Sequence, residues 1–93
     1  GADPALLAKR AILIGCGAVG SHIAQALAAS GVGQLSLVDP DVLSNDNIHR
    51  HILGAAHVGS KKADAMREVL LGRYPHLDVR SIPVSIEAAL DVN

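Results

Sequence analysis

The sequence predicts an α/β fold, built on a parallel sheet with helices on both faces. An apolar run, residues 11–14 (AILI), leads directly into a glycine turn, residues 15–20 (GCGAVG), and apolar residues at helical spacing follow. Two further strand-like segments, 34–39 and 77–84, alternate with helical patterns. Because this alternation is typical of parallel sheets, we expect the order βαβαβ, half of a doubly wound, Rossmann-like domain.

The composition agrees with one small domain of this class. The chain has 93 residues, is 49% hydrophobic and contains no Phe or Trp, so Ala, Val, Leu and Ile carry its apolar content. These side chains suit closely packed helices on a parallel sheet. The net charge of −1 indicates neither nucleic acid nor an anionic membrane as a partner. No apolar run approaches the ~18 residues of a membrane span, and the single cysteine favours a cytoplasmic location.

The glycine turn has the spacing G-x-G-x-x-G, and each glycine has an expected role. Gly15 permits the tight turn, Gly17 lets a phosphate come close to the backbone, and Gly20 lets the next helix pack on the strand. The N-terminus of that helix would present free N–H groups to the phosphates. The alternative is a glycine-rich turn without a ligand, but the strand before it and the helix after it favour nucleotide binding.

The helix after the glycine turn is expected over residues 19–30, ending at Gly31 and burying one apolar stripe: Ile23, Ala24, Leu27 and Ala28. The second strand ends in Asp39, nineteen residues after Gly20. At this offset, an acidic side chain accepts hydrogen bonds from the two ribose hydroxyls in nucleotide-binding βαβ units. The spacing therefore predicts that Asp39 holds a ribose.

Six more segments are expected in this order: a polar loop at 40–47, a helical turn at 48–53, a loop at 54–59, a helix at 61–74, a strand at 77–84 and a helix at 86–90. Ser60 and Ser85 are the predicted N-caps of the two helices. Met66 and Tyr74 recur at helical spacing and are expected in the core.

The apolar first strand is expected at an edge of the sheet, because the usual order of the first three strands is 3-2-1. Exposed apolar edges tend to find partners. We therefore expect residues 1–93 to be the N-terminal half of a nucleotide-binding domain in a longer protein. The isolated chain is expected to pair through its first strand, exchange segments or aggregate.

Three segments near the second strand occur in a distinctive order: residues 38–41 (VDPD), 44–51 (SNDNIHRH) and 58–62 (VGSKK). Together with the glycine turn, they resemble the ubiquitin-activating-enzyme-like family of ThiF, MoeB and HesA. The pattern of that family is a glycine loop, LVDxD, a SNLxRQ-like stretch and VGxxK. The resemblance covers about residues 9–83.

The resemblance implies an adenylyltransferase that uses ATP and Mg²⁺. In such enzymes, the C-terminal carboxylate of a ubiquitin-like or sulfur-carrier protein attacks the α-phosphorus, and pyrophosphate leaves. The expected partner is therefore a ubiquitin-like or sulfur-carrier protein, and the expected assembly is a homodimer.

The resemblance also assigns the ATP site residue by residue. The glycines would face the phosphates and Asp39 would hold the ribose, in agreement with the spacing argument. Asn47 and Arg50 match the family's residues near the triphosphate, and Lys62 matches its lysine. Asp41 is a candidate to orient Arg50. Arg50 and Lys62 are the expected catalytic residues, because Arg suits bidentate oxygen contacts and Lys a point-charge contact.

The sequence departs from the family pattern at several positions. Asp46 and His51 stand where the family often has Ser and Gln, and the loop between Arg50 and Gly59 is about one residue shorter than in MoeB-like members. The family's magnesium-binding aspartate and catalytic cysteine would lie beyond Asn93. We therefore expect the 93-residue chain alone to be inactive.

Two other functions fit part of the pattern. The NAD-binding half of a dehydrogenase would explain the glycine turn and Asp39, but not Asn47, Arg50 and Lys62. A non-catalytic interaction fragment would keep the fold without turnover. Cys16 is expected as a small packed side chain rather than a nucleophile, and no metal site is expected from His49 and His51.

Overall fold

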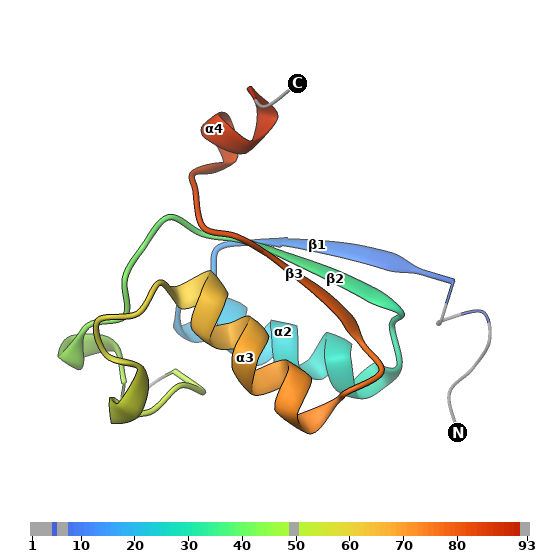
Figure 1. The fold of residues 1–93 in the computed structure, drawn as a ribbon, viewed down its shortest axis with the longest axis horizontal. Coiled ribbons are helices and arrows are strands. Elements are labelled where there is room, and N and C mark those ends of the chain that lie inside the picture. Colours follow the sequence, from blue (N-terminus) through green and yellow to red (C-terminus); the bar gives the residue numbers. More distant parts are fainter. Residues whose placement is uncertain (1–4, 6–7, 49–50, 92–93) are drawn as a thin grey trace.

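The computed structural model describes residues 5, 8–48 and 51–91, which contain one three-stranded parallel sheet (Figure 1). Its strands are β1 (Arg10–Ile14), β2 (Gln34–Val38) and β3 (Asp78–Ile82), in the spatial order β1-β2-β3. In the register, Leu13 pairs with Leu37, and Leu37 pairs with Ser81. The predicted parallel pairing and strand order are confirmed.

Two long helices cover one face of the sheet. These are α2 (Ala18–Ser30) and α3 (Lys62–Arg73), whereas the short α4 (Ile86–Leu90) lies on the other side of the sheet (Figure 1). Both crossovers move the chain in the same direction along the sheet, and right-handed crossovers then place both helices on the same face. The prediction of helices on both faces is met on the second face only by α4, which buries none of its residues.

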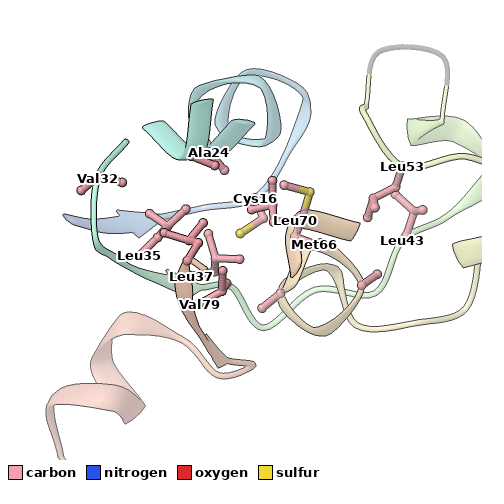
Figure 2. Packing of buried hydrophobic residues seen from close by; sticks show 14 residues of the cluster. Cys16, Ala24, Val32, Leu35, Leu37, Leu43, Leu53, Met66, Leu70 and Val79 are labelled. Carbon is pink, nitrogen blue, oxygen red and sulfur yellow. The ribbon is translucent and has the colours of Figure 1, made fainter. Parts of the chain in front are cut away.

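The hydrophobic core lies between the sheet and these two helices (Figure 2). Leu35 and Leu37 of β2 and Met66 and Leu70 of α3 are completely buried. The fully buried side chains of α2 are small (Ser21, Ala24 and Ala28), so this helix sits close to the sheet, and Leu27 packs against the core partly buried. Met66 is in the core as predicted, and Tyr74 packs against it half-buried. Among the described residues, no helix is long and apolar enough to cross a membrane.

Strand β1 forms the predicted edge of the sheet. Ile12 is 70% exposed and Ile14 is 59% exposed, and both lie on the face opposite α2 and α3. Within the part of the chain that the structure describes, no element covers this part of the second face, so only the alternate residues of β1, Ala11 and Leu13, pack against the core.

Three local predictions differ from the structure. Ile23 is 45% exposed, because α2 turns Ser21, Ala24 and Ala28 toward the sheet. The helical turn expected at 48–53 is absent from its described residues, and short 3₁₀ turns occur instead at η1 (Asn45–Asn47) and η2 (Ala55–His57). The third difference is at Ser60, which does not cap α3.

The start of α3 is displaced by a pairing between two loop segments. The Leu43 N–H donates to the Ser60 carbonyl at 2.9 Å, and Val42 forms an antiparallel bridge with Lys61. Lys61 is the N-cap and is extended, so α3 begins at Lys62, one residue later than predicted, without a side-chain cap. By contrast, Ser85 caps α4 as predicted, because its hydroxyl accepts the Ala88 N–H at 3.1 Å.

Candidate functional site

The predicted site residues that the structure describes lie at the carboxyl end of the sheet, where the loops after β1 and β2 leave the same edge (Figure 1). This edge is the usual ligand position in open parallel α/β sheets. The glycine loop, residues 15–20, follows β1, and Asp39 follows β2. The paired segments 41–43 and 59–62 continue from Asp39 to the start of α3.

Each glycine of the loop has a distinct environment. Gly15 has φ of +95°, and its N–H donates to the Val38 carbonyl at 2.8 Å, which extends the sheet pairing by one residue. At Gly20, a Cβ atom would lie 2.1 Å from the Gly15 carbonyl oxygen, so no side chain fits. Gly17 is the N-cap of α2, and a Cβ atom there or at Gly15 would have no neighbour within 4 Å.

These environments fit the backbone of a phosphate loop. The contact at Gly20 holds the first turn of α2 against the end of β1, so that the N-terminus of α2 is fixed beside the sheet. The space beside Gly15 and Gly17 leaves their backbone open to a ligand. Free N–H groups at a helix N-terminus attract anions.

Asp39 binds the glycine loop through its side chain. Its carboxylate accepts the Cys16 N–H at Oδ2 (2.5 Å) and the Asp41 N–H at Oδ1 (2.7 Å), and the residue is only 4% exposed. Each carboxylate oxygen has lone pairs beyond the one used here. The structure therefore gives Asp39 a role in orienting the loop, and ribose binding stays a prediction for the remaining lone pairs.

Lys62 lies beside the carboxylate of Asp41 with its own side chain largely buried. Its Nζ is 3.9 Å from Asp41 Oδ2, and its N–H donates to the Asp41 carbonyl at 2.9 Å. The Lys62 side chain is 10% exposed, whereas that of Asp41 is 68% exposed. A buried ammonium with one partly solvated partner is suited to a further anion. Asp41 thus lies near Lys62, the cation predicted from the VGxxK pattern.

Two predicted site residues cannot be placed by their side chains. Arg50 lies outside the described residues, so its predicted pairing with Asp41 stays a prediction. The backbone of Asn47 ends η1, and its side chain is outside the description. The structure therefore brings together the glycine loop, Asp39, Asp41 and Lys62.

Cys16 is the packed side chain that the sequence predicted. It is completely buried in the cluster that contains Met66 and Leu70 (Figure 2). Burial raises the pKa of the Cys16 thiol to about 12, with a further increase from Asp39 and an opposing effect of Lys62. The thiol is therefore protonated at neutral pH and unsuited to nucleophilic attack.

His51 is a site residue that the sequence reasoning missed. It is 8% exposed, and its Nδ1 accepts the Leu53 N–H at 3.1 Å, which places the ring proton on Nε2. Nε2 then donates to the Cys16 carbonyl at 2.5 Å. The available signal was the Gln of the family pattern at this position, since Gln also combines a donor and an acceptor. No three His, Cys, Asp or Glu side chains in the described ranges gather as a metal site.

Comparisons with known proteins place this geometry in a family. The chain is 33% identical to the adenylyltransferase and sulfurtransferase UBA4 of Saccharomyces cerevisiae over 81 residues, covering 86% of this chain and 18% of that protein. It is 36% identical to the ATP-dependent ubiquitin transferase-like protein Cap2 of Pseudomonas aeruginosa over 88 residues, covering 90% and 16%.

A solved structure of Escherichia coli MccB with ATP has the same fold. Its TM-score is 0.86 at 29% identity, and the match covers 95% of this chain and 28% of MccB. The chain therefore spans only a minor part of each of these relatives. The model of the ThiF family matches residues 3–92, nearly the whole sequence. The chain belongs to the ThiF family.

Proposed function

We propose that this chain is the N-terminal half of a Rossmann-like ATP-binding domain in an enzyme that adenylates the C-terminal carboxylate of a ubiquitin-like or sulfur-carrier protein. The observation that carries the proposal is the carboxyl-end site. An open glycine loop at the N-terminus of α2 lies at the same edge as the buried Lys62 ammonium. The adenylyltransferase UBA4 and the ATP complex of MccB, both similar to this chain, support it.

In this proposal, the chain's own residues bind and orient the nucleotide. The N–H groups of the glycine loop and of the first turn of α2 face the phosphates, and Lys62 places a positive charge beside them. Asp39 holds the ribose and at the same time keeps the hydrogen bond that it accepts from the Cys16 N–H. Asn47 and Arg50 are proposed near the triphosphate on the family pattern alone. When bound, ATP supplies the electrophilic α-phosphorus and a pyrophosphate leaving group.

The remaining parts of the proposal rest on the family. A ubiquitin-like or sulfur-carrier protein is the proposed acceptor of the adenylyl group, through its C-terminal carboxylate, and Mg²⁺ would accompany the triphosphate. Catalysis by the 93 residues alone is not expected. The homodimer and the cytoplasmic location stay predictions. The glycine loop and Asp39 would also suit NAD, so binding of ATP and of NAD must be compared.

Calorimetry with ATP or NAD, each with Mg²⁺, tests the nucleotide. We expect the chain to bind ATP in preference to NAD. Lys62→Ala should weaken ATP binding by about tenfold, because it removes a charge-assisted contact. The matched control is Lys61→Ala, which removes the neighbouring exposed lysine and should change the affinity less than twofold. A preference for NAD, or equal losses in the two variants, would contradict the proposal.

A further inference from the structure

The side chain of His51 bridges two backbone segments that lie far apart in the sequence. Nδ1 accepts the Leu53 N–H, and Nε2 donates to the carbonyl of Cys16, thirty-five residues away. On the other side of Cys16, the N–H is held by Asp39. One side chain therefore holds each of the two peptide units that flank Cys16, and both side chains come from the connection between β2 and α3.

The direction of the Cys16 carbonyl determines that of the next N–H. In a planar trans peptide, the C=O and N–H bonds of one unit point in opposite directions. The unit between Cys16 and Gly17 directs its carbonyl toward His51, so the Gly17 N–H points away from the imidazole. Gly17 is the N-cap of α2 and has open space beside it. The histidine thus determines which way this N–H of the glycine loop points.

We propose that neutral His51 is a positioning residue that aims the Gly17 N–H at the bound phosphates, and that protonation of the imidazole releases the loop. The second half follows from the hydrogen bonds. A protonated ring carries a proton on Nδ1, which would face the Leu53 N–H donor to donor. In the proposal the ring moves and Nε2 leaves the Cys16 carbonyl; movement of the Leu53 segment alone would leave the loop held. The part concerning phosphate rests on the proposed ATP function.

The surroundings of His51 favour its neutral form. Burial lowers the pKa of His51 below its ordinary value of 6.5, and the charges of Lys62 and His22 lower it further. The hydrogen bond to the Cys16 carbonyl and the carboxylate of Asp39 act in the opposite direction. These groups face the ring from α2, α3 and the loops after β1 and β2. The ring is therefore neutral at pH 7 and becomes charged under acidic conditions.

Substitution by Gln separates positioning from titration. The Gln amide has a donor and an acceptor but no proton to gain in this pH range, so His51→Gln keeps the bridge and removes the pH response. His51→Leu removes both the hydrogen-bonded bridge and the pH response. His76→Gln is the matched control, because His76 is exposed and lies near the amino end of β3.

The first measurement needs no nucleotide. In NMR spectra of the ¹⁵N-labelled chain, the ring nitrogens of His51 should show the Nε2–H tautomer at pH 7. The amide signals of Cys16 and Gly17 should shift together with the His51 titration, with a midpoint below 6.5. They should not titrate in His51→Gln and should titrate normally in His76→Gln. The proposal would be overturned by an Nδ1–H tautomer, or by amide signals of Cys16 and Gly17 that do not shift as His51 titrates.

The second measurement is calorimetry with ATP and Mg²⁺ above and below the His51 midpoint. The wild-type chain should lose about tenfold more affinity on acidification than His51→Gln, the loss of about one hydrogen bond. Because ATP itself titrates identically in both experiments, the difference belongs to the protein. Equal losses would refute the coupling to phosphate. If neither protein binds ATP at any pH, the proposed function fails, and the NMR experiment still decides whether His51 holds the loop.

Discussion

The two ends of the sheet differ in whether their polar side chains are buried or exposed. At the carboxyl end, Asp39, His51 and Lys62 are all at least nine-tenths buried and bonded to backbone or paired. At the amino end, charges remain in solvent. Asp78 and Arg80 form a 3.4 Å ion pair in which both side chains are more than half exposed.

Burying polar groups is unfavourable unless each finds a partner, whereas exposed ion pairs contribute little in either direction. Asp39, His51 and Lys62 have such partners, and the proposed function gives their position at the carboxyl end a use. The experiments below compare the two ends of the sheet.

The largest expected contrast concerns Cys16, inside the glycine loop. A thiol pKa of about 12 in place of 9.0 reduces the thiolate fraction at pH 8 by about a thousandfold, so alkylation should slow by about that factor. Iodoacetamide labelling followed by mass spectrometry, with and without urea, measures this. Equal labelling rates in the folded and unfolded chain would show that the loop is not packed as described.

The next contrast compares two helical glycines. Gly20→Ala would place a Cβ 2.1 Å from the Gly15 carbonyl oxygen, and we expect it to lower the free energy of unfolding by about 3 kcal/mol or more. Gly72→Ala, in α3 near the amino end of the sheet, meets nothing within 4 Å and should raise it by about 0.5–1 kcal/mol. Urea denaturation measures both, and equal effects would contradict the close packing of α2.

A smaller contrast tests the space beside the loop. Gly17 and Gly54 are both N-caps with extended backbone, and a Cβ atom would meet nothing at either position. Gly17→Ala should weaken ATP binding by about tenfold, because its methyl group enters the proposed phosphate position. Gly54→Ala should leave the affinity unchanged. Each should alter the free energy of unfolding by less than about 1 kcal/mol, so a larger loss at Gly17 would indicate a structural role instead.

The smallest effects are expected at the amino end. Arg80→Ala removes the exposed ion pair with Asp78, and Arg73→Ala removes an exposed 2.6 Å hydrogen bond to Gln25. Each should change the free energy of unfolding by less than about 0.5 kcal/mol and leave ATP affinity unaffected. A change above 1 kcal/mol in urea denaturation would show that this end also contributes substantially to stability.

Local patterns were sufficient to predict most of the fold. The three strands and the helices α2, α3 and α4 lie within two residues of their predicted bounds, because apolar periodicity and glycines act over short distances. Ser60 shows where this reasoning ends. It has the chemistry of an N-cap, but its carbonyl pairs with the Leu43 N–H and Lys61 becomes the N-cap of α3; no local signal contains that contact. Ile23 was misplaced because helical spacing alone did not determine which side of α2 faces the sheet.

The site was predictable in its residue types and less so in its connections. The spacing from Gly20 to Asp39 predicted an acid at the correct edge of the sheet, but not that its carboxylate holds the Cys16 N–H. His51 was noted as a departure from the family pattern and was not expected to form a metal site with His49. Its bridge joins Leu53 to a carbonyl thirty-five residues earlier, and only the folded chain brings these groups together.

The pairing of residues 41–43 with 59–62 also determines how this protein tolerates changes in length. The intervening segment is a loop whose two ends are hydrogen-bonded to each other, so a residue inserted between them need not move either end. Doubling the length of such a loop costs only about 0.6 kcal/mol in closure entropy. Residues 54–56 are exposed and follow the buried Leu53, which makes them the place for insertions and deletions. A loop one residue shorter than in MoeB-like members is thus compatible with unchanged positions of Asp41 and Lys62.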